Sequence, residues 1–218
     1  MKGEIIFVTG IGTSIGKTLV SAVVTEALGA DYWKPVQSGL EGPTDTETVR
    51  SLVKNPHVRF LKEAFSLQTP ASPHLSSRID NVHISLEDIV AEFNRQRDPE
   101  KVTVVEGAGG LMVPLNEKDF FTDLIPLLGA RVIVVSNQYL GNINHSLLTA
   151  EVLKHRGLPV MGWIFNGTYH VNEEDIVRWS GLHKIGRIEQ EDKVDAGVVR
   201  RYAEAIRPRL LQHLQRKY

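Results

Sequence analysis

Short apolar runs alternate with longer amphipathic stretches along most of this chain. The runs are rich in β-branched residues and have the length of buried strands, and they cover residues 4–9, 32–36, 102–106, 131–136, 160–166 and, more weakly, 183–188. Apolar positions with helical spacing predict helices between them, at about 17–28, 44–54, 85–97, 145–156, 172–180 and 195–216. This alternation predicts an α/β fold, with a mainly parallel sheet covered by helices on both faces.

The stretch from residue 55 to residue 83 is the least regular part of the chain, with Pro56, Pro70 and Pro73. We predict that it crosses the carboxyl-terminal edge of the sheet, where open α/β sheets bind ligands. No repeat, low-complexity tract or linker divides the 218 residues. The sequence therefore predicts one domain over residues 1–218.

A glycine-rich segment, Gly10-Ile-Gly-Thr-Ser-Ile-Gly-Lys-Thr18, joins the first predicted strand to the first predicted helix. Strand, glycine-rich turn, Gly-Lys-Thr and helix form the context of a phosphate-binding P-loop. Backbone N–H groups converge at such a helix start, and the helix dipole favours an anion there. Lys17 adds a positive charge for the phosphates, and the Thr18 hydroxyl is suited to bind Mg²⁺. The prediction is a P-loop NTPase-type domain.

The spacing of this loop differs from the standard motif, which has four residues between its first glycine and Gly-Lys. Here five residues separate Gly10 from Gly16. The alternative is a tight turn that contains Gly-Lys-Thr without binding phosphate. The position of the strand and the helix favours the P-loop.

Composition narrows the class of protein. The chain is 42% hydrophobic and 23% charged, as in soluble globular proteins, and its net charge of −1 argues against nucleic-acid binding. The absence of cysteine excludes disulfides and thiolate chemistry, and no two of the eight histidines have metal-ligand spacing. No segment has the length of a membrane-spanning helix, and the first strand starts too early for a signal peptide. These features predict a cytoplasmic protein with no membrane partner.

Two polar clusters follow predicted strands. Lys34 leaves the second strand beside a proline, where its charge suits a phosphate, a carboxylate or a carbamate; a surface lysine at a turn is the alternative. Glu106 ends an apolar strand and is followed by Gly107-Ala-Gly-Gly110, which lets a ligand approach the backbone. A carboxylate buried there needs a cation, and Mg²⁺ fits; an exposed acid at a sharp turn is the alternative.

Three further segments have an ordinary explanation as well as a functional one. Asp45 lies in a turn that leads into a predicted helix, where it can bind a metal, or can be the N-cap or an acid of the first turn. Residues 140–146 open another helix. Its free N–H groups can bind a carboxylate, or Asn144 or a residue nearby can be an ordinary N-cap. Asn166 ends a strand before Gly167, where its amide can contact a purine or simply form a turn.

Together these motifs resemble the ATP-dependent dethiobiotin synthetases of biotin biosynthesis. The resemblance rests on the P-loop with its five-residue spacer, Lys34-Pro-Val-Gln-Ser-Gly39, Asp45, Ser72-Pro-His74, Val105-Glu-Gly-Ala-Gly-Gly110, Leu140-Gly, Ile143-Asn-His145, Gly162-Trp163 and Asn166. These pieces occur in the order of the family across nearly the whole chain. The chain departs from it at Ser14, where the family often has an acid, and at Glu189, where it often has proline.

The resemblance implies a reaction and a set of sites. The family makes dethiobiotin from 7,8-diaminononanoate, CO₂ and ATP through a phosphorylated carbamate, with Mg²⁺ and as a homodimer. The resemblance implies that Lys17 and Lys34 are catalytic residues and that the metal ligands are Thr18, Asp45 and Glu106. The implied nucleotide-binding residues are Ser14, Ile15, Gly16, Lys17, Thr18, Leu19, Asp45, Glu106, Gly107, Ala108, Gly109, Asn166, Gly167, Gly186, Arg187 and Ile188. The implied substrate-binding residues are Thr13, Ser38, Gly141, Asn142, Ile143 and Asn144.

The alternative function is a nucleotide-switch ATPase of the partition or maturation-factor type, which shares this kind of P-loop. Such ATPases carry an additional lysine early in the loop. This chain has Ile11, Gly12, Thr13 and Ser14 there. A dependence of ATP turnover on a diamine separates the two functions.

Overall fold

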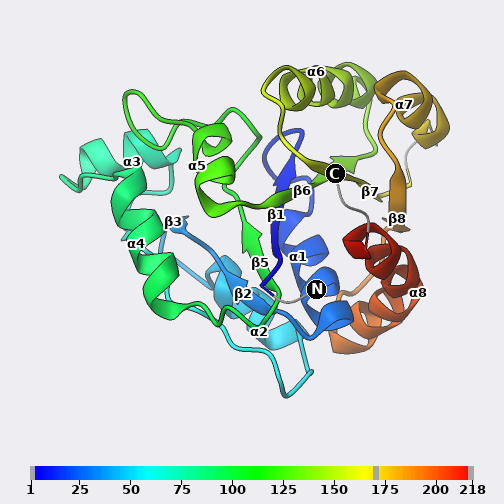
Figure 1. The fold of residues 1–218 in the computed structure, drawn as a ribbon, viewed down its shortest axis with the longest axis horizontal. Helices are drawn as coiled ribbons and strands as arrows, with labels where there is room; N and C mark the ends of the chain where they lie inside the picture. The colour runs from blue at the N-terminus through cyan, green and yellow to red at the C-terminus, as the bar shows by residue number, and fades with distance from the viewer. Residues whose placement is uncertain (1–2, 169–171, 216–218) are drawn as a thin grey trace.

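The main sheet is parallel throughout and has helices on both faces (Figure 1). The computed structural model describes residues 3–168 and 172–215. The sheet has the order β2-β5-β1-β6-β7-β8, formed by β1 (Ile5–Gly10), β2 (Asp31–Trp33), β5 (Thr103–Glu106), β6 (Arg131–Asn137), β7 (Val160–Asn166) and β8 (Lys184–Ile188). The predicted fold class is confirmed, and the weak strand pattern near residue 185 is confirmed as β8, which pairs with β7.

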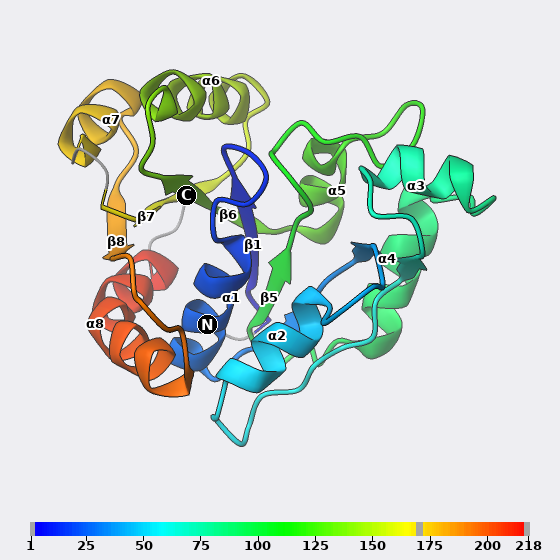
Figure 2. The same ribbon diagram turned by 180° about the vertical axis from the view of Figure 1, so that it is seen from behind.

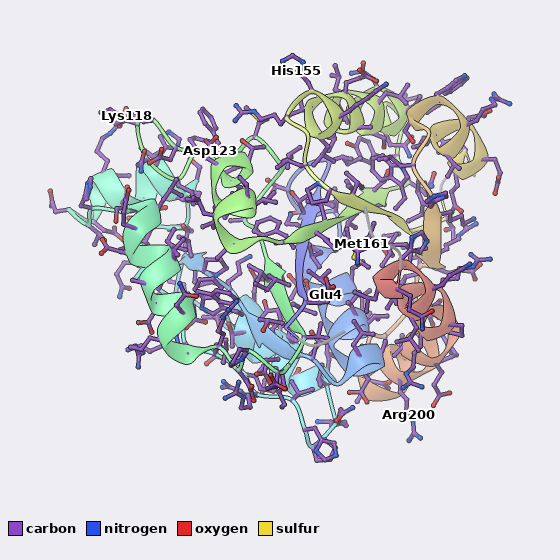
Figure 3. All side chains as sticks on the ribbon, viewed as in Figure 1. Glu4, Lys118, Asp123, His155, Met161 and Arg200 are labelled. Carbon is purple, nitrogen blue, oxygen red and sulfur yellow. The ribbon has the colours of Figure 1, made fainter. Side chains whose placement is uncertain are left out.

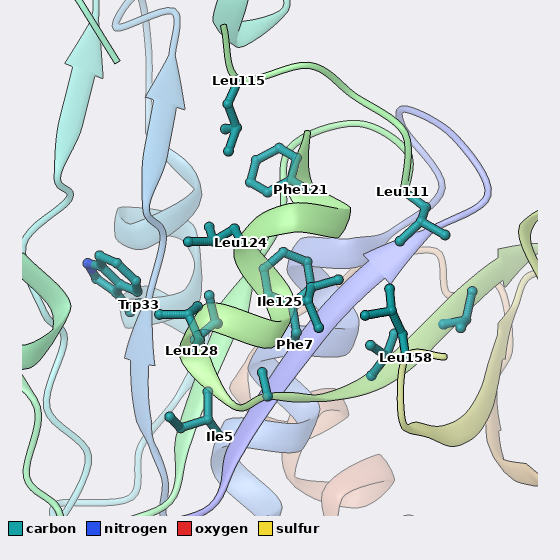
Figure 4. Close-up of a cluster of buried hydrophobic side chains, with 14 of the residues drawn as sticks. Ile5, Phe7, Trp33, Leu111, Leu115, Phe121, Leu124, Ile125, Leu128 and Leu158 are labelled. Carbon is teal, nitrogen blue, oxygen red and sulfur yellow. The ribbon is translucent and has the colours of Figure 1, made fainter. Parts of the chain in front are cut away.

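Alternate residues of the strands enter two hydrophobic cores, because successive side chains point to opposite faces. Ile6 and Val8 pack with α1 (Lys17–Leu28), α2 (Asp45–Leu52) and α8 (Ala196–Gln215). Ile5 and Phe7 pack with the helices of the other face, which are α4 (Leu86–Gln96), α5 (Phe121–Leu128), α6 (Asn142–His155) and α7 (Glu173–Ser180). Figure 4 shows part of this second core around Phe7 and α5.

Charged side chains lie mainly at the periphery. In Figure 3, Lys118, His155 and Arg200 project outward, whereas Met161 lies within the fold on β7 and is fully buried. Within the described ranges, no helix has the length and apolar character needed to span a bilayer.

The strand predicted over residues 32–36 is divided, which corrects the sequence assignment. β2 ends at Trp33, and β3 (Val36–Ser38) belongs to a separate two-stranded sheet with β4 (Phe65–Leu67). Pro35 has no N–H for a ladder, and its carbonyl accepts hydrogen bonds from the N–H groups of Ala64 and Phe65. The chain therefore leaves the main sheet at Lys34.

The pattern missed three elements besides β3. The irregular stretch 55–83 contains β4 and α3 (Pro73–Ile79), and α5 lies in a region that was given no helix. The missed α5 is short and contains Pro126, although Phe121, Leu124, Ile125 and Leu128 have helical spacing and are buried. The helix predicted from residue 145 begins earlier, at Asn142.

The ends of β1 and β5 place two glycine-rich loops side by side. The strands pair with Val8 opposite Glu106, so the P-loop and residues 107–110 leave the same edge of the sheet. The P-loop is the blue loop beyond the tip of β1, and it stands between α5 and α6 in both views (Figures 1 and 2). This edge holds the candidate site.

Candidate active site

A cavity of about 440 Å³ lies at the carboxyl ends of β1 and β5. It is lined by Thr13, Ser14, Ile15, Gly16, Lys17, Thr18, Lys34, Val36, Gln37, Ser38, Asp45, Ala71, Glu106, Ala108 and Gly109. Most of the sequence-predicted site residues therefore meet in one space. Ala71 comes from the irregular stretch, which reaches this edge as predicted.

The P-loop is held in a conformation that few side chains allow. Gly16 has φ +90°, and a Cβ there would stand 2.1 Å from Nδ2 of Asn166. Ser14 also has a positive φ, 56°, which is uncommon for a residue other than glycine. Such strain persists where the surrounding structure fixes the backbone, as it does in ligand-binding loops.

Lys17 spans its own loop. Its Nζ donates to the carbonyl oxygen of Gly12 at 3.0 Å. Within residues 3–168 and 172–215, no carboxylate forms an ion pair with this ammonium. Burial, and then the positive charge of Lys34, lower the pKa of Lys17 to about 8. An anion bound beside Lys17 would restore its usual preference for the charged form.

Three oxygens converge at the floor of the cavity. The Thr18 hydroxyl lies 2.9 Å from Oδ1 of Asp45 and 2.9 Å from Oε1 of Glu106. Ligands at adjacent corners of a magnesium octahedron are also about 2.9 Å apart, because each lies about 2.0–2.1 Å from the ion. The described ranges contain no cluster of three or more His, Asp or Glu side chains suited to a metal. Two carboxylates and a hydroxyl nevertheless fit Mg²⁺, which takes its other ligands from water and phosphate.

The ordinary explanations of these two carboxylates have different outcomes. Thr44, not Asp45, is the N-cap of α2, in a capping box with Glu47, whereas Asp45 is an acid in the first turn of this helix. The Asp45 carboxylate also contacts Thr18 and Lys34. Glu106 is 1% exposed, so it is not an acid at an exposed turn.

Lys34 lies between the two carboxylates. Its Nζ is 2.7 Å from Oδ2 of Asp45, 3.3 Å from Oε1 of Glu106 and 3.0 Å from the carbonyl oxygen of Gly107. It is only 3% exposed, so it is not a surface lysine. Burial acts to lower the pKa of Lys34, but the charges of Glu106 and Asp45 raise it above its usual value. Lys34 in turn lowers the pKa of Asp45 against the opposing effect of burial.

Ser38 lies at the cavity with an unused polar atom. Its Oγ is buried and has no hydrogen-bond partner among the residues that the structure describes. Such a group is expected to meet a ligand or water. The exposed Thr13 lines the cavity as well. A small polar substrate bound next to the P-loop would therefore lie close to both residues.

Asn166 contacts the P-loop from β7, outside the cavity. Its Nδ2 donates to the carbonyl oxygen of Ile15 at 3.0 Å, so the amide supports the loop. Gly167 follows with φ +86°, as in an Asn-Gly turn. Arg187 donates to the carbonyl oxygen of Gly167 at 3.4 Å and lies 3.3 Å from Oε1 of the buried Glu173. Asn166, Gly167 and Arg187 therefore form one group beside the loop.

Other predicted nucleotide residues do not line the cavity. The side chains of Leu19 and Ile188 pack against the hydrophobic core. Gly186 lies in β8, where a Cβ would stand 2.5 Å from Ile206. The carbonyl of Gly107 accepts from Lys34. Only the backbone of these residues is suited to contact a ligand.

The start of α6 lies apart from the cavity. Its N-cap is Gly141, with φ +102°, so this helix start has its N-cap near Asn144 rather than at Asn144. Asn142 is buried, and its amide exchanges hydrogen bonds with Asn172 and donates to Gln138. Its N–H donates to the carbonyl oxygen of Tyr139. The backbone of Ile143 and the exposed Asn144 are left to meet an anion.

Sequence reasoning missed Gln37 and Tyr32. The Gln37 side chain bridges the loop: it donates to the carbonyl oxygens of Ser38 and Gly39 and accepts from the N–H of Asp45. Tyr32 donates to Glu106 at 2.8 Å. The sequence spacing could have indicated Tyr32. It lies two residues before Lys34, so in an extended chain the two side chains point to the same side.

Comparison with known proteins decides the family. The chain is 47% identical to an ATP-dependent dethiobiotin synthetase BioD of Christiangramia forsetii over 94% of this chain and 97% of that protein. The chain belongs to the ATP-dependent dethiobiotin synthetase family. A BioD of Cytophaga hutchinsonii is 45% identical over 90% of this chain and 94% of its own length. A family model described as an AAA domain matches residues 4–197.

Solved structures agree on the fold. The MinC:MinD cell division complex of Aquifex aeolicus gives a TM-score of 0.61 at 16% identity, covering 99% of this chain and 97% of that chain. A plasmid partition protein of Borrelia burgdorferi gives 0.61 at 15% identity, covering 97% and 99%. At these identities the likeness shows the P-loop fold alone, and it does not favour a switch function over the synthetase family.

We expect Asn166→Ala to raise the KM for ATP about 3- to 10-fold and to change kcat less, because loss of the hydrogen bond to Ile15 would loosen the P-loop in the ground and transition states alike. Asn166→Asp, which keeps the size but loses the donor to Ile15, should raise KM as well. Steady-state kinetics measure both, with Asn94→Ala on the exposed face of α4 as the control. An unchanged KM in both variants would leave Asn166 only a turn-forming role.

Proposed function

We propose that this chain closes the ureido ring of dethiobiotin from 7,8-diaminononanoate and CO₂, with ATP converted to ADP and phosphate. Membership of the dethiobiotin synthetase family supports this activity. The observation that carries the proposal is the position of Lys34, buried between Asp45 and Glu106 in the same cavity as Lys17. A nucleotide switch has no evident use for that second lysine. We further propose that residues 1–218 act as one domain.

The chemistry has three steps. One amine of the diamine adds to CO₂ and releases a proton, which gives a carbamate. A carbamate oxygen then attacks the γ-phosphorus of ATP, and the bond to ADP breaks. Finally the second amine attacks the carbamate carbon, and phosphate leaves with its bonding electrons while the amine loses a proton. The middle step brings anionic groups together, so positive charge and positioning are the main demands on the protein.

Different residues of the site would supply the positive charge and the positioning. The P-loop N–H groups and Lys17 would hold the β- and γ-phosphates. Lys34 would neutralise the carbamate oxygen and the transferring phosphoryl group. The free Ser38 hydroxyl, with Thr13, would orient the carbamate. Asn166, Gly167 and Arg187, with the backbone after Gly186, would border the base and ribose.

Thr18, Asp45 and Glu106 would hold Mg²⁺, which would neutralise phosphate charge when bound. The convergence of their oxygens supports this assignment. Lys34 also supplies positive charge to two of these ligands, the Asp45 and Glu106 carboxylates. This contact stabilises the charged forms of the two carboxylates against the effect of burial.

We also propose a homodimer, in which Gly141–Asn144 of one subunit would meet the substrate carboxylate of the other. An apolar groove of about 270 Å³ supports it, because Ile11, Leu111, Met112 and Val113 meet Leu148 and Val152 of α6 there. Met112 and Leu148 are 42% and 58% exposed in the single chain. Light scattering of the purified protein tests it, and a strictly monomeric active enzyme would contradict it.

The decisive experiment is mass spectrometry of the products made from the diamine, bicarbonate, Mg²⁺ and ATP. We expect a product with the mass of the diamine plus CO₂ minus water, formed in equal amount to ADP. Omission of the diamine should stop ADP formation. An analogue with one amine is the control, because it forms a carbamate but cannot close a ring. ATP turnover that ignores the diamine would instead indicate a nucleotide switch.

A further inference from the structure

A buried tyrosine, which is not among the residues that line the cavity, donates a hydrogen bond to the candidate magnesium ligand Glu106. Tyr32 is fully buried, and its hydroxyl donates to Oε2 of Glu106 at 2.8 Å. Tyr32 lies opposite Val104 in the pairing of β2 with β5. Glu106 is two residues beyond Val104, so its side chain points to the same face of the sheet.

The two oxygens of Glu106 have different partners. Oε1 accepts from the Thr18 hydroxyl at 2.9 Å and from Lys34 at 3.3 Å. Oε2 accepts from Tyr32. Glu106 is 1% exposed, and a buried carboxylate oxygen that loses its donor is costly. One oxygen of the carboxylate is thus bound to Tyr32, and the other faces Thr18.

We propose that Tyr32 is a positioning residue for metal binding: its hydroxyl holds the Glu106 carboxylate in the rotation that directs Oε1 toward Thr18 and Asp45. The inference rests on the proposed function, which makes these three residues the magnesium ligands. Outer partners of this kind commonly tune a metal site by orienting the groups that bind the ion.

The surroundings of Tyr32 fix its ring in place. Its N–H donates to the carbonyl oxygen of Arg59, and its own carbonyl accepts from the N–H of Leu61. The ring packs against Phe60, with centroids 6.2 Å apart. The ring is thereby held where its hydroxyl donates to Oε2 of Glu106.

The test is Tyr32→Phe, which keeps the ring and removes only the donor. Binding of Mn²⁺ to the protein with ADP, followed by electron paramagnetic resonance, reports metal affinity without turnover. We expect this affinity to fall about 10-fold, by analogy with other outer-shell partners. Binding of ADP without metal should change little. The Mg²⁺ concentration for half-maximal activity should rise by a similar factor.

Tyr202→Phe is the matched control, since it removes a tyrosine donor to another glutamate, the part-buried Glu191, which does not line the cavity. It should leave Mn²⁺ affinity unchanged. Tyr32→Met is a second variant without a donor, and thermal melting shows that each protein is folded. A lower melting temperature for Tyr32→Phe with unchanged Mn²⁺ affinity would overturn the proposal and leave Tyr32 a core residue.

Glu106→Gln separates this proposal from the one on which it rests. If Glu106→Gln lowers Mn²⁺ affinity and Tyr32→Phe does not, the metal site stands and the role of Tyr32 is wrong. If both lower the affinity, the positioning role is supported. If Glu106→Gln leaves the affinity unchanged, Glu106 is not a metal ligand, and the proposed magnesium site fails together with the role of Tyr32.

Discussion

Lys17→Ala should reduce kcat on the order of 10²-fold or more, because a preorganised positive charge is lost where phosphate charge develops. Among the residues that the structure describes, the Gly12 carbonyl is the one hydrogen-bond partner of this ammonium. Its burial gives the charge a strong effect on a nearby phosphate. Product formation measured by mass spectrometry checks the loss. The exposed Lys54→Ala at the end of α2 is the matched control.

The pH dependence of nucleotide binding provides a second measurement on Lys17. Its pKa of about 8 means that the ammonium is charged below pH 8 and becomes neutral above it. The affinity for ADP should therefore fall as pH rises from about 7 to 9, and this fall should be smaller in Lys17→Ala. Calorimetry across that range measures it. Near-wild-type kcat in Lys17→Ala would contradict the P-loop assignment itself.

The fold and the P-loop could be predicted because their signals are local. Strand, turn and helix follow one another within residues 4–28, and each has its own periodicity. Glu106 was recognisable as a buried acid because it ends an apolar strand before a glycine-rich turn. The division of the 32–36 strand was not recognised, since its cause lies in the hydrogen bonds of Pro35 with distant residues 64 and 65.

The partners of each site residue were harder to predict. Asp45 has the sequence context of a helix cap, and only the fold shows that Thr44 takes that position and leaves the carboxylate for Lys34. The contact of Tyr32 with Glu106 joins residues 74 positions apart. The start of α6 was recognised as a helix opening, but the pairing of Asn142 with Asn172 depends on how α6 and α7 pack.

Lys34→Gln should reduce kcat about 10²-fold or more while the affinity for ADP stays within a few-fold of wild type. The Lys34 ammonium forms ion pairs with Asp45 and Glu106 and donates a hydrogen bond to the Gly107 carbonyl. In turnover it would serve the carbamate oxygen and the transferring phosphoryl group, which are not part of ADP. Its charge therefore acts more on the transition state than on nucleotide binding.

Two assays on one preparation decide the role of Lys34: ADP binding by calorimetry, and dethiobiotin formation by mass spectrometry. Thermal melting with and without Mg²⁺ controls for folding, because the substitution leaves Asp45 and Glu106 without their buried cation. Mg²⁺ should recover part of the lost melting temperature, since it would replace that positive charge. If ADP affinity collapses in parallel with kcat, Lys34 is one more phosphate ligand. If neither changes, Lys34 has no part in the reaction, and the synthetase mechanism loses the residue that distinguishes it from simple ATP hydrolysis.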